Sequence, residues 1–215
     1  HPYQWRSGVK HDCAAVLELS RGGPNIYRNK LGQETALEPE VVHPWFKGTD
    51  LKNDAPATRL SLLLPQTSPG EDTARRFQSA PQAWRYLKQH QPFFAARKSS
   101  IYRKRDPFAI FGVGDYTFAP WKVALSALHR QPHFVVVGPE DGRPVLFDDT
   151  CYFIALSSQQ EASIVAQILN SELCQKFLAT LVFPGAKRTV TVELLQRVNL
   201  SALARALGLE KAWLD

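Results

Sequence analysis

RKSSIYRKRDPFAIFGVGDYTFAPWKVALSA, residues 97–127, is the stretch that decides both the predicted fold and the candidate site. Serine and tyrosine hydroxyls lie among five cations in its first nine residues: Arg97, Lys98, Arg103, Lys104 and Arg105. Turns marked by glycine or proline follow, each with an aromatic residue, and Lys122 then opens an apolar run. Cations, hydroxyls and aromatic rings on a tight loop are suited to contact with a nucleic acid.

Short strands are predicted on both sides of this stretch, because short apolar runs bounded by turn residues are typical of strands. Residues 26–37 predict a hairpin that turns at Leu31-Gly32, and residues 41–42 a short extended piece. The strands after residue 121 predict a meander of antiparallel neighbours. Strand-like runs occur at residues 14–19, 59–64, 122–128, 134–138, 144–147 and 151–156.

Helical patterns lie mainly toward the C-terminal end. Ser79 and Gln82 are spaced as a capping box at the start of a helix over residues 79–90. Ser158 and Glu161 have the same spacing and open a second helix, which ends near Asn170. Further helices are predicted at residues 173–182, at residues 190–198, and from a cap at Ser201 to Gly208. The predicted fold class is α+β: a mixed, largely antiparallel sheet with C-terminal helices packed on it.

Composition places the chain among globular proteins, since 44% of its 215 residues are hydrophobic and 21% are charged. We expect one domain over residues 1–215, with residues 1–78 and 79–215 as possible sub-parts. The longest apolar runs are strand-sized, well short of the ~20 residues of a membrane span, so no membrane partner is expected. Methionine is absent, even at position 1, which predicts that the chain is a portion of something longer.

The net charge and the cysteine content bear on the kind of partner and on the cellular compartment. A net charge of +6 and a pI of about 9.3 permit an anionic partner without requiring one. The three cysteines, Cys13, Cys151 and Cys174, are widely separated and lack metal-ligand spacing. We interpret them as reduced core residues of a cytoplasmic protein.

Cofactor and metal sites have weaker support in the sequence. Gly112-Val113-Gly114 lacks the third glycine of a dinucleotide or S-adenosylmethionine loop, and a strand follows it instead of a helix. We interpret it as a structural turn that lets another backbone pass closely. A metal-dependent nuclease is an open alternative in which Asp12 and Glu18 form the acidic pair, although Ser20 fills the position where such a site needs a lysine.

Three basic turns form the candidate site: residues 97–105, Lys187-Arg188 on a Pro-Gly loop, and Lys47-Gly48-Thr49. Their cations would neutralise phosphates, and the arginines could also read guanine edges. A protein-interaction module with incidental basic loops is the second open alternative. We predict DNA contacts from Lys47, Lys98, Ser100, Tyr102, Arg103, Arg105, Lys122, Lys187 and Arg188.

An ordered set of motifs extends over nearly the whole chain. WRSGVKHDCAAVLEL and VVHPWFKGTDL come first, followed by RKSSIYRKRDPF and IFGVGDYTFAPWKVALSAL. DDTCYFIAL, EASIVAQILNSEL and LVFPGAKRTVT complete the set. Together they resemble the C-terminal part of N6-adenine DNA methyltransferases of restriction–modification systems, including fused restriction enzyme–methylases.

The resemblance implies a target-recognition domain without its catalytic half. In that family the catalytic domain lies N-terminal and carries the S-adenosylmethionine motif and an Asn-Pro-Pro-Tyr-type motif, and both motifs are absent from this sequence. The implied partners are double-stranded DNA and the N-terminal methyltransferase domain of the same protein. The adenine would flip into that partner domain, so this chain alone is expected neither to bind cofactor nor to methylate.

Overall fold

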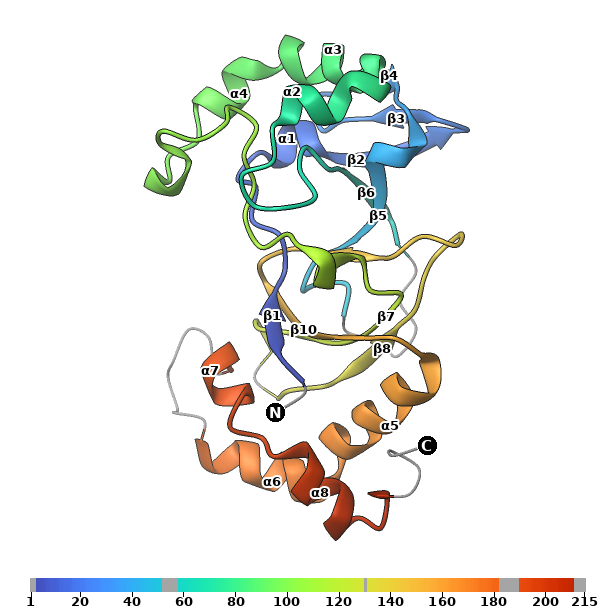
Figure 1. Cartoon of the computed structure of the whole chain (residues 1–215), viewed down its shortest axis with the longest axis vertical. Coiled ribbons are helices and arrows are strands. Elements are labelled where there is room, and N and C mark those ends of the chain that lie inside the picture. Colours follow the sequence, from blue (N-terminus) through green and yellow to red (C-terminus); the bar gives the residue numbers. More distant parts are fainter. Residues whose placement is uncertain (1–2, 52–57, 130, 182–189, 211–215) are drawn as a thin grey trace.

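The computed structural model describes residues 3–51, 58–129, 131–181 and 190–210. Two sheets organise them (Figure 1). The four-stranded sheet has the order β1-β10-β7-β8 and the six-stranded sheet the order β4-β3-β2-β6-β5-β9. Every described strand pairing is antiparallel except that of β5 with β9. The predicted mixed, largely antiparallel α+β class is therefore confirmed.

The strand bounds follow the predicted runs closely at most positions. The four-stranded sheet consists of β1 (Trp5–Ser7), β10 (Cys151–Leu156), β7 (Trp121–Ser126) and β8 (Val135–Val137). The six-stranded sheet consists of β4 (Glu34–Ala36), β3 (Ile26–Arg28), β2 (Glu18–Gly23), β6 (Leu60–Leu63), β5 (Val42–Phe46) and β9 (Leu146–Phe147).

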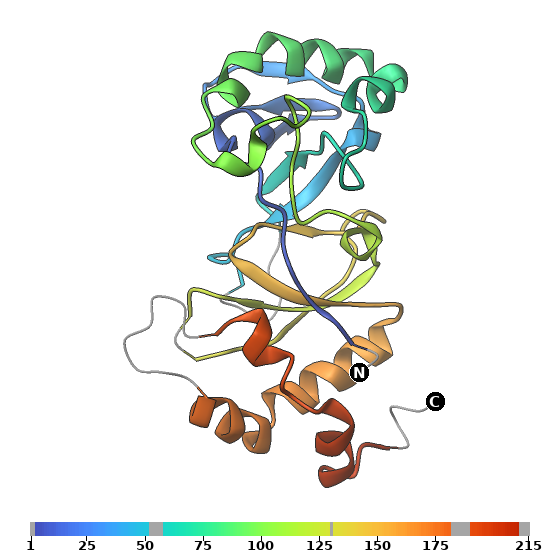
Figure 2. The same ribbon diagram turned by 60° about the vertical axis from the view of Figure 1, so that its left-hand side comes forward.

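Helices cover the two ends of the molecule (Figures 1 and 2). At the end of the six-stranded sheet lie α1 (Ala14–Leu17), α2 (Thr73–Arg76), α3 (Pro81–Gln89) and α4 (Gln91–Ala95). At the other end lie α5 (Gln159–Asn170), α6 (Glu172–Leu181), α7 (Val192–Leu195) and α8 (Leu200–Ala206). Short 3₁₀ turns form η1 (Pro39–Val41), η2 (Phe77–Ser79), η3 (Ser100–Tyr102) and η4 (Asp115–Phe118).

Strand β10 shows how the four-stranded sheet is buried on both faces. Tyr152 and Ile154 point into the core shared with α5–α8, as the period of two requires. Phe153, on the opposite face, belongs to a second cluster together with Phe46 of β5 and Phe147 of β9. The Phe153 and Phe147 ring centroids lie 5.3 Å apart, so this aromatic cluster packs the two sheets against each other.

Close backbone crossings fix the same junction. A Cβ on Gly8 would lie 2.1 Å from the carbonyl oxygen of Asp148, closer than real Cβ atoms approach backbone. Gly112 has a φ of +70°, and a Cβ there would lie 2.3 Å from the Gly8 carbonyl oxygen. The interpretation of Gly112-Val113-Gly114 as a turn that lets a backbone pass is confirmed.

Four local predictions were wrong. Of residues 14–19, the first four form helix α1 and only the last two begin β2, because the Val16 and Leu17 N–H groups donate to the Cys13 carbonyl. Ser79 does not cap α3, since the Gln82 and Ala83 N–H groups donate to the Glu38 carboxylate at 2.7 and 2.9 Å.

At the C-terminal end, Asn199 and not Ser201 caps α8, by accepting from the Ala202 N–H at 3.0 Å. Residues 144–147 do not continue a meander, because β9 leaves it and pairs with β5 in the other sheet.

Neither sheet follows the possible boundary between residues 78 and 79. Strand β1 pairs with β10 in the four-stranded sheet, whereas β2 to β6 build the six-stranded one. Helices α3 and α4 come after residue 78, yet they pack in the core of the six-stranded sheet. Among the described residues, every helix is too short or too polar to cross a membrane.

Candidate nucleic-acid interface

The basic loop, residues 97–105, follows α4 and contains no acidic residue. Lys98, Arg103, Lys104 and Arg105 are all exposed. Within the described parts of the chain, no carboxylate lies within ion-pair distance of these four side chains. Many of the other exposed cations are paired, as Arg28 is with Glu34 and Lys176 with Glu172. The loop therefore presents a concentration of positive charge that the fold leaves unneutralised.

Arg97 differs from its neighbours because its guanidinium is turned into the fold. Its Nη1 donates to the carbonyls of His11 and Ala109, at 3.2 and 2.6 Å. Its Nη2 and Nε donate to the carbonyls of Pro107 and Phe94, at 2.8 and 3.1 Å. These four bonds tie the start of the loop to the segment that follows it and to the chain near β1, so Arg97 positions the loop.

Tyr102 completes this anchor. The Arg97 guanidinium carbon lies 3.6 Å from the centroid of the Tyr102 ring, a cation–π contact. The Tyr102 ring also lies near Phe111, at a centroid distance of 5.5 Å. Burial raises the pKa of Tyr102 above its usual value. The ring of Tyr102 thus supports the loop, while Ser100 is exposed at the start of η3.

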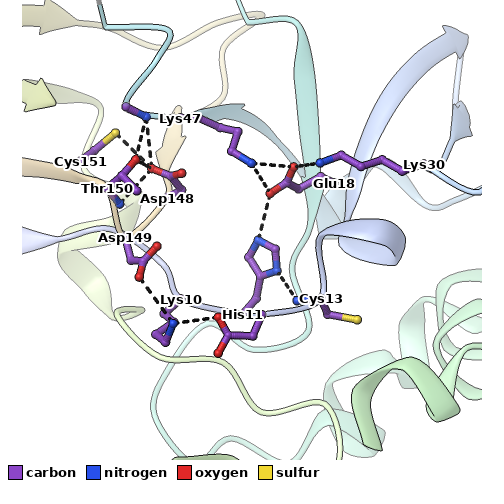
Figure 3. A network of polar contacts seen from close by, with 12 residues as sticks. Lys10, His11, Cys13, Glu18, Lys30, Lys47, Asp148, Asp149, Thr150 and Cys151 are labelled. Carbon is purple, nitrogen blue, oxygen red and sulfur yellow. Dashed lines mark hydrogen bonds and ion pairs between the residues drawn. The ribbon is translucent and has the colours of Figure 1, made fainter. Parts of the chain in front are cut away.

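Lys47 is not a free cation. Its Nζ lies 2.9 and 3.1 Å from the two carboxylate oxygens of Glu18, whose side chain is only 2% exposed (Figure 3). Lys30 binds the same carboxylate at 2.5 Å, and the His11 ring lies 3.5 Å from it. Burial alone would raise the pKa of Glu18, but the hydrogen bonds from His11, Lys30 and Lys47 lower it to about 2. The charge of Lys47 stabilises a buried anion between the sheets, which does not fit the predicted DNA contact.

A second buried carboxylate, Asp148, holds the turn between β9 and β10 (left in Figure 3). Its Oδ1 accepts from the N–H of Gly48 at 3.3 Å and from the N–H and hydroxyl of Thr150 at 3.1 and 2.5 Å. Burial raises the pKa of Asp148, and the bonds from Thr150 and Cys151 oppose that rise. Gly48 thus belongs to the junction, together with the adjacent Lys47.

Lys122 also departs from the prediction. Its side chain is 1% exposed, and its Nζ donates to the Ala119 carbonyl at 2.6 Å. Burial lowers the pKa of Lys122 to about 7. A side chain so enclosed in β7 cannot support a contact with DNA at the surface. Lys187 and Arg188, the remaining predicted contacts, lie outside the described residues.

The nuclease alternative loses its acidic pair. Both oxygens of Glu18 are held by lysines, so a metal ion there would have to displace two ion pairs. Asp12 is exposed and pairs with Lys10 at 2.8 Å. In the described ranges, no group of three or more His, Cys, Asp or Glu side chains could hold a metal ion.

A known protein sequence supports the resemblance described for the motifs. The chain is 37% identical over 205 residues to "Type II methyltransferase M.NspV" from Nostoc sp., an alignment that covers 95% of this chain and 42% of that protein. The chain thus spans less than half the length of its relative. The sequence resemblance is confirmed at the level of part of a type II methyltransferase. No protein-family model matches.

A comparison of structures finds the type IIL restriction-modification enzyme MmeI, solved in complex with DNA. The TM-score is 0.48 at 13% identity, over 98% of this chain and 32% of that one.

Proposed function

Since the chain is related to part of a type II methyltransferase, we propose that it is a target-recognition domain of an adenine-N6 DNA methyltransferase of a restriction–modification system. Its partner is double-stranded DNA. Methyl transfer, together with S-adenosylmethionine, belongs to an N-terminal methyltransferase domain of the same protein. The chain described here supplies the contacts that select the DNA sequence.

One observation carries the proposal: four exposed cations without an ion pair are gathered on a loop whose base is fixed. Lys98, Arg103, Lys104 and Arg105 can release counterions from DNA phosphates, which is the main source of affinity for a polyanion. Arginine can also bind the O6 and N7 of a guanine with two bonds, so Arg105 is suited to sequence selection.

The anchored base of the loop bears on the cost of binding. Ordering a mobile, rotamer-rich segment at an interface costs roughly 0.5–1.5 kcal/mol per side chain. Arg97 already ties the loop to four carbonyl groups in the free chain. The Arg97 side chain is therefore already ordered and adds none of this cost when DNA binds.

Titration with salt tests the proposal. Binding of a labelled DNA duplex is measured by fluorescence anisotropy from about 50 to 200 mM NaCl, and log Kd is plotted against log salt concentration. Lys98→Ala, Arg103→Ala and Arg105→Ala are each expected to reduce the slope by about 1. Lys176→Ala is the matched control, because Lys176 is an exposed cation that is already paired with Glu172 on α6.

The proposal is refuted if the chain shows no salt-sensitive duplex binding, or if the loop variants and Lys176→Ala have the same slope. Selection of bound duplexes from a random pool then tests sequence preference. Arg105→Ala is expected to relax that preference at an individual base pair by about 1–3 kcal/mol.

A further inference from the structure

A hollow of about 250 Å³ lies between α4 and the basic loop. It is smaller than the roughly 300–1,000 Å³ of pockets that enclose drug-sized ligands, so its occupant would be a small group. Its lining consists of Gln91, Phe94, Ala95, Arg97, Lys98, Ser99, Tyr102, Arg103 and Pro107.

The lining has the chemistry of an anion site. It includes three cations, Arg97, Lys98 and Arg103, and the hydroxyl-bearing residues Ser99 and Tyr102, but no carboxylate. Another hollow on the described surface is about 430 Å³ in volume and differs in kind, because leucine, phenylalanine and alanine from α6 and α8 make up most of its lining. Of these two hollows, the one beside the basic loop is suited to negative charge.

The three cations have different tasks. The Arg97 guanidinium donates four hydrogen bonds to backbone carbonyls, so it forms a fixed side of the hollow. Lys98 and Arg103 are exposed and have no ion pair in the described chain, so their charges remain available. The Arg103 N–H closes η3 on the Ser100 carbonyl at 3.1 Å, which brings Arg103 back toward Lys98 across one turn.

Lys104 provides an internal contrast. It is the next residue, is also exposed, and has a φ of +58° at the tip of the following turn. It is not part of the lining of the hollow. Two adjacent cations of the same loop therefore differ in whether they border the hollow, although both contribute to the general positive field.

We propose that this hollow binds one phosphodiester phosphate of the DNA backbone, with Lys98 and Arg103 supplying the charge, Ser99 a hydroxyl donor, and Arg97 the fixed geometry. The inference rests on the proposed function and deepens it. One phosphate held at a fixed site would set the register of the loop on the duplex, while other cations contact phosphates less specifically.

Amide NMR of the full chain with inorganic phosphate as the probe tests the site. Saturable chemical-shift changes are expected at the amides of Ser99 and Arg103. The phosphate affinity obtained from the titration should be at least fivefold lower in Lys98→Ala and Arg103→Ala. Lys104→Ala is the matched control and should retain the wild-type affinity for phosphate. A DNA duplex should shift the same amides and be displaced from them by excess phosphate.

The outcomes separate the two proposals. Shifts spread over all exposed cations without saturation, or equal losses in Arg103→Ala and Lys104→Ala, would overturn the phosphate site even where duplex binding and its salt slope persist. Phosphate binding at Ser99 and Arg103 with no competition from duplex would show a site for free phosphate and overturn the assignment to DNA. Absence of duplex binding by the whole chain would instead count against the proposed function itself.

Arg97→Lys tests the positioning role, since lysine keeps the charge but cannot make four bonds to carbonyls in the same plane. The expected result is weaker phosphate affinity with an unchanged salt slope for DNA. In the Arg97→Lys background, Arg103→Ala should cost less than it does in the wild type, because the two residues act through one geometry. Strictly additive effects would contradict this role.

Discussion

Replacement of Glu18 by glutamine is expected to remove a pH-dependent part of the stability. The Glu18 side chain is 2% exposed and its pKa is lowered from 4.5 to about 2. A shift of about 2.5 units at 1.36 kcal/mol per unit corresponds to about 3 kcal/mol in favour of the folded state at neutral pH. The size is an upper bound for the variant, because glutamine retains the shape of the side chain and can still accept one hydrogen bond.

The sign follows from the direction of the shift. A carboxylate whose folded-state pKa is lowered stabilises the fold above its unfolded pKa, and that stability is lost as the pH falls toward the folded value. Here the window runs from pH 4.5 down to about 2. At pH 3.5 about 1.4 kcal/mol of the contribution should already be gone, while between pH 6 and 7 it should be constant.

Urea unfolding of the wild type and of Glu18→Gln at several pH values between 3.5 and 7 measures the difference. The gap between the two free energies of unfolding should be widest at pH 6–7 and narrow toward pH 3.5. Lys10→Ala is a suitable control, because Lys10 pairs with Asp12 and Asp149 at the surface, where such pairs contribute little. A gap that is absent at pH 7, or that stays constant down to pH 3.5, would refute the assignment of Glu18 as a buried, ion-paired anion.

Three further changes test other parts of the structure. Glu38→Ala should cost about 1–2 kcal/mol in urea unfolding, because the Glu38 carboxylate caps α3 through two N–H groups, whereas Glu40→Ala at an exposed neighbouring position should be close to neutral. Gly8→Ala should destabilise the chain by about 1–3 kcal/mol or more, since the new Cβ would overlap the Asp148 carbonyl. Gly23→Ala should not destabilise it, because nothing lies within 4 Å of a Cβ at that position. Comparable thermal melts of the two variants would contradict this. Burial lowers the pKa of Lys122 to about 7, so the fold disfavours its charged form and the stability of the wild type should rise from pH 7 to 10.5. Lys122→Met should abolish this rise. An unchanged pH profile of unfolding would contradict this.

Most of the strands and α5 were predictable because their signals are local. Strand β10 carries a continuous apolar run, and its two buried faces explain why alternation with polar residues is missing. Ser158 caps α5 as predicted, since its hydroxyl accepts from the Glu161 N–H at 3.2 Å, three residues away. The exposure of Lys98, Arg103 and Arg105 follows from the same kind of local pattern: a polar run between proline-marked turns.

The errors share a different cause, which is a partner distant in sequence. Glu38 caps α3 from 44 residues away, so nothing near Ser79 could reveal it. Lys47 meets Glu18 across 29 residues, and only the pairing of β2 and β5 with β6 brings them together. Lys122 resembles a surface cation in sequence, but both faces of β7 are buried, so its side chain is enclosed on whichever face it lies.

The different roles of the cations in the basic loop could not be predicted from the sequence either. Arg97 and Lys98 are adjacent cations, yet one is bound by carbonyls and the other is exposed. The backbone that receives Arg97 comes from residues 11 and 107–109, which the chain brings together only in the fold. A signal for such a residue in sequence would have to come from its distant partners.

The position of the basic loop follows from the same chain segment that joins the two sheets. Gly8 passes beneath Asp148, and two residues later Lys10 exchanges backbone hydrogen bonds of 2.9 Å with Phe111. Next in the chain, the His11 ring reaches Glu18 while the His11 carbonyl accepts from Arg97. A displacement of this segment therefore moves the anchor of the loop together with the buried carboxylate. Gly8→Ala should accordingly weaken phosphate binding in the loop more than Glu38→Ala does, even where the two variants lose the same free energy of unfolding. Only Gly8→Ala acts on the segment that holds Arg97.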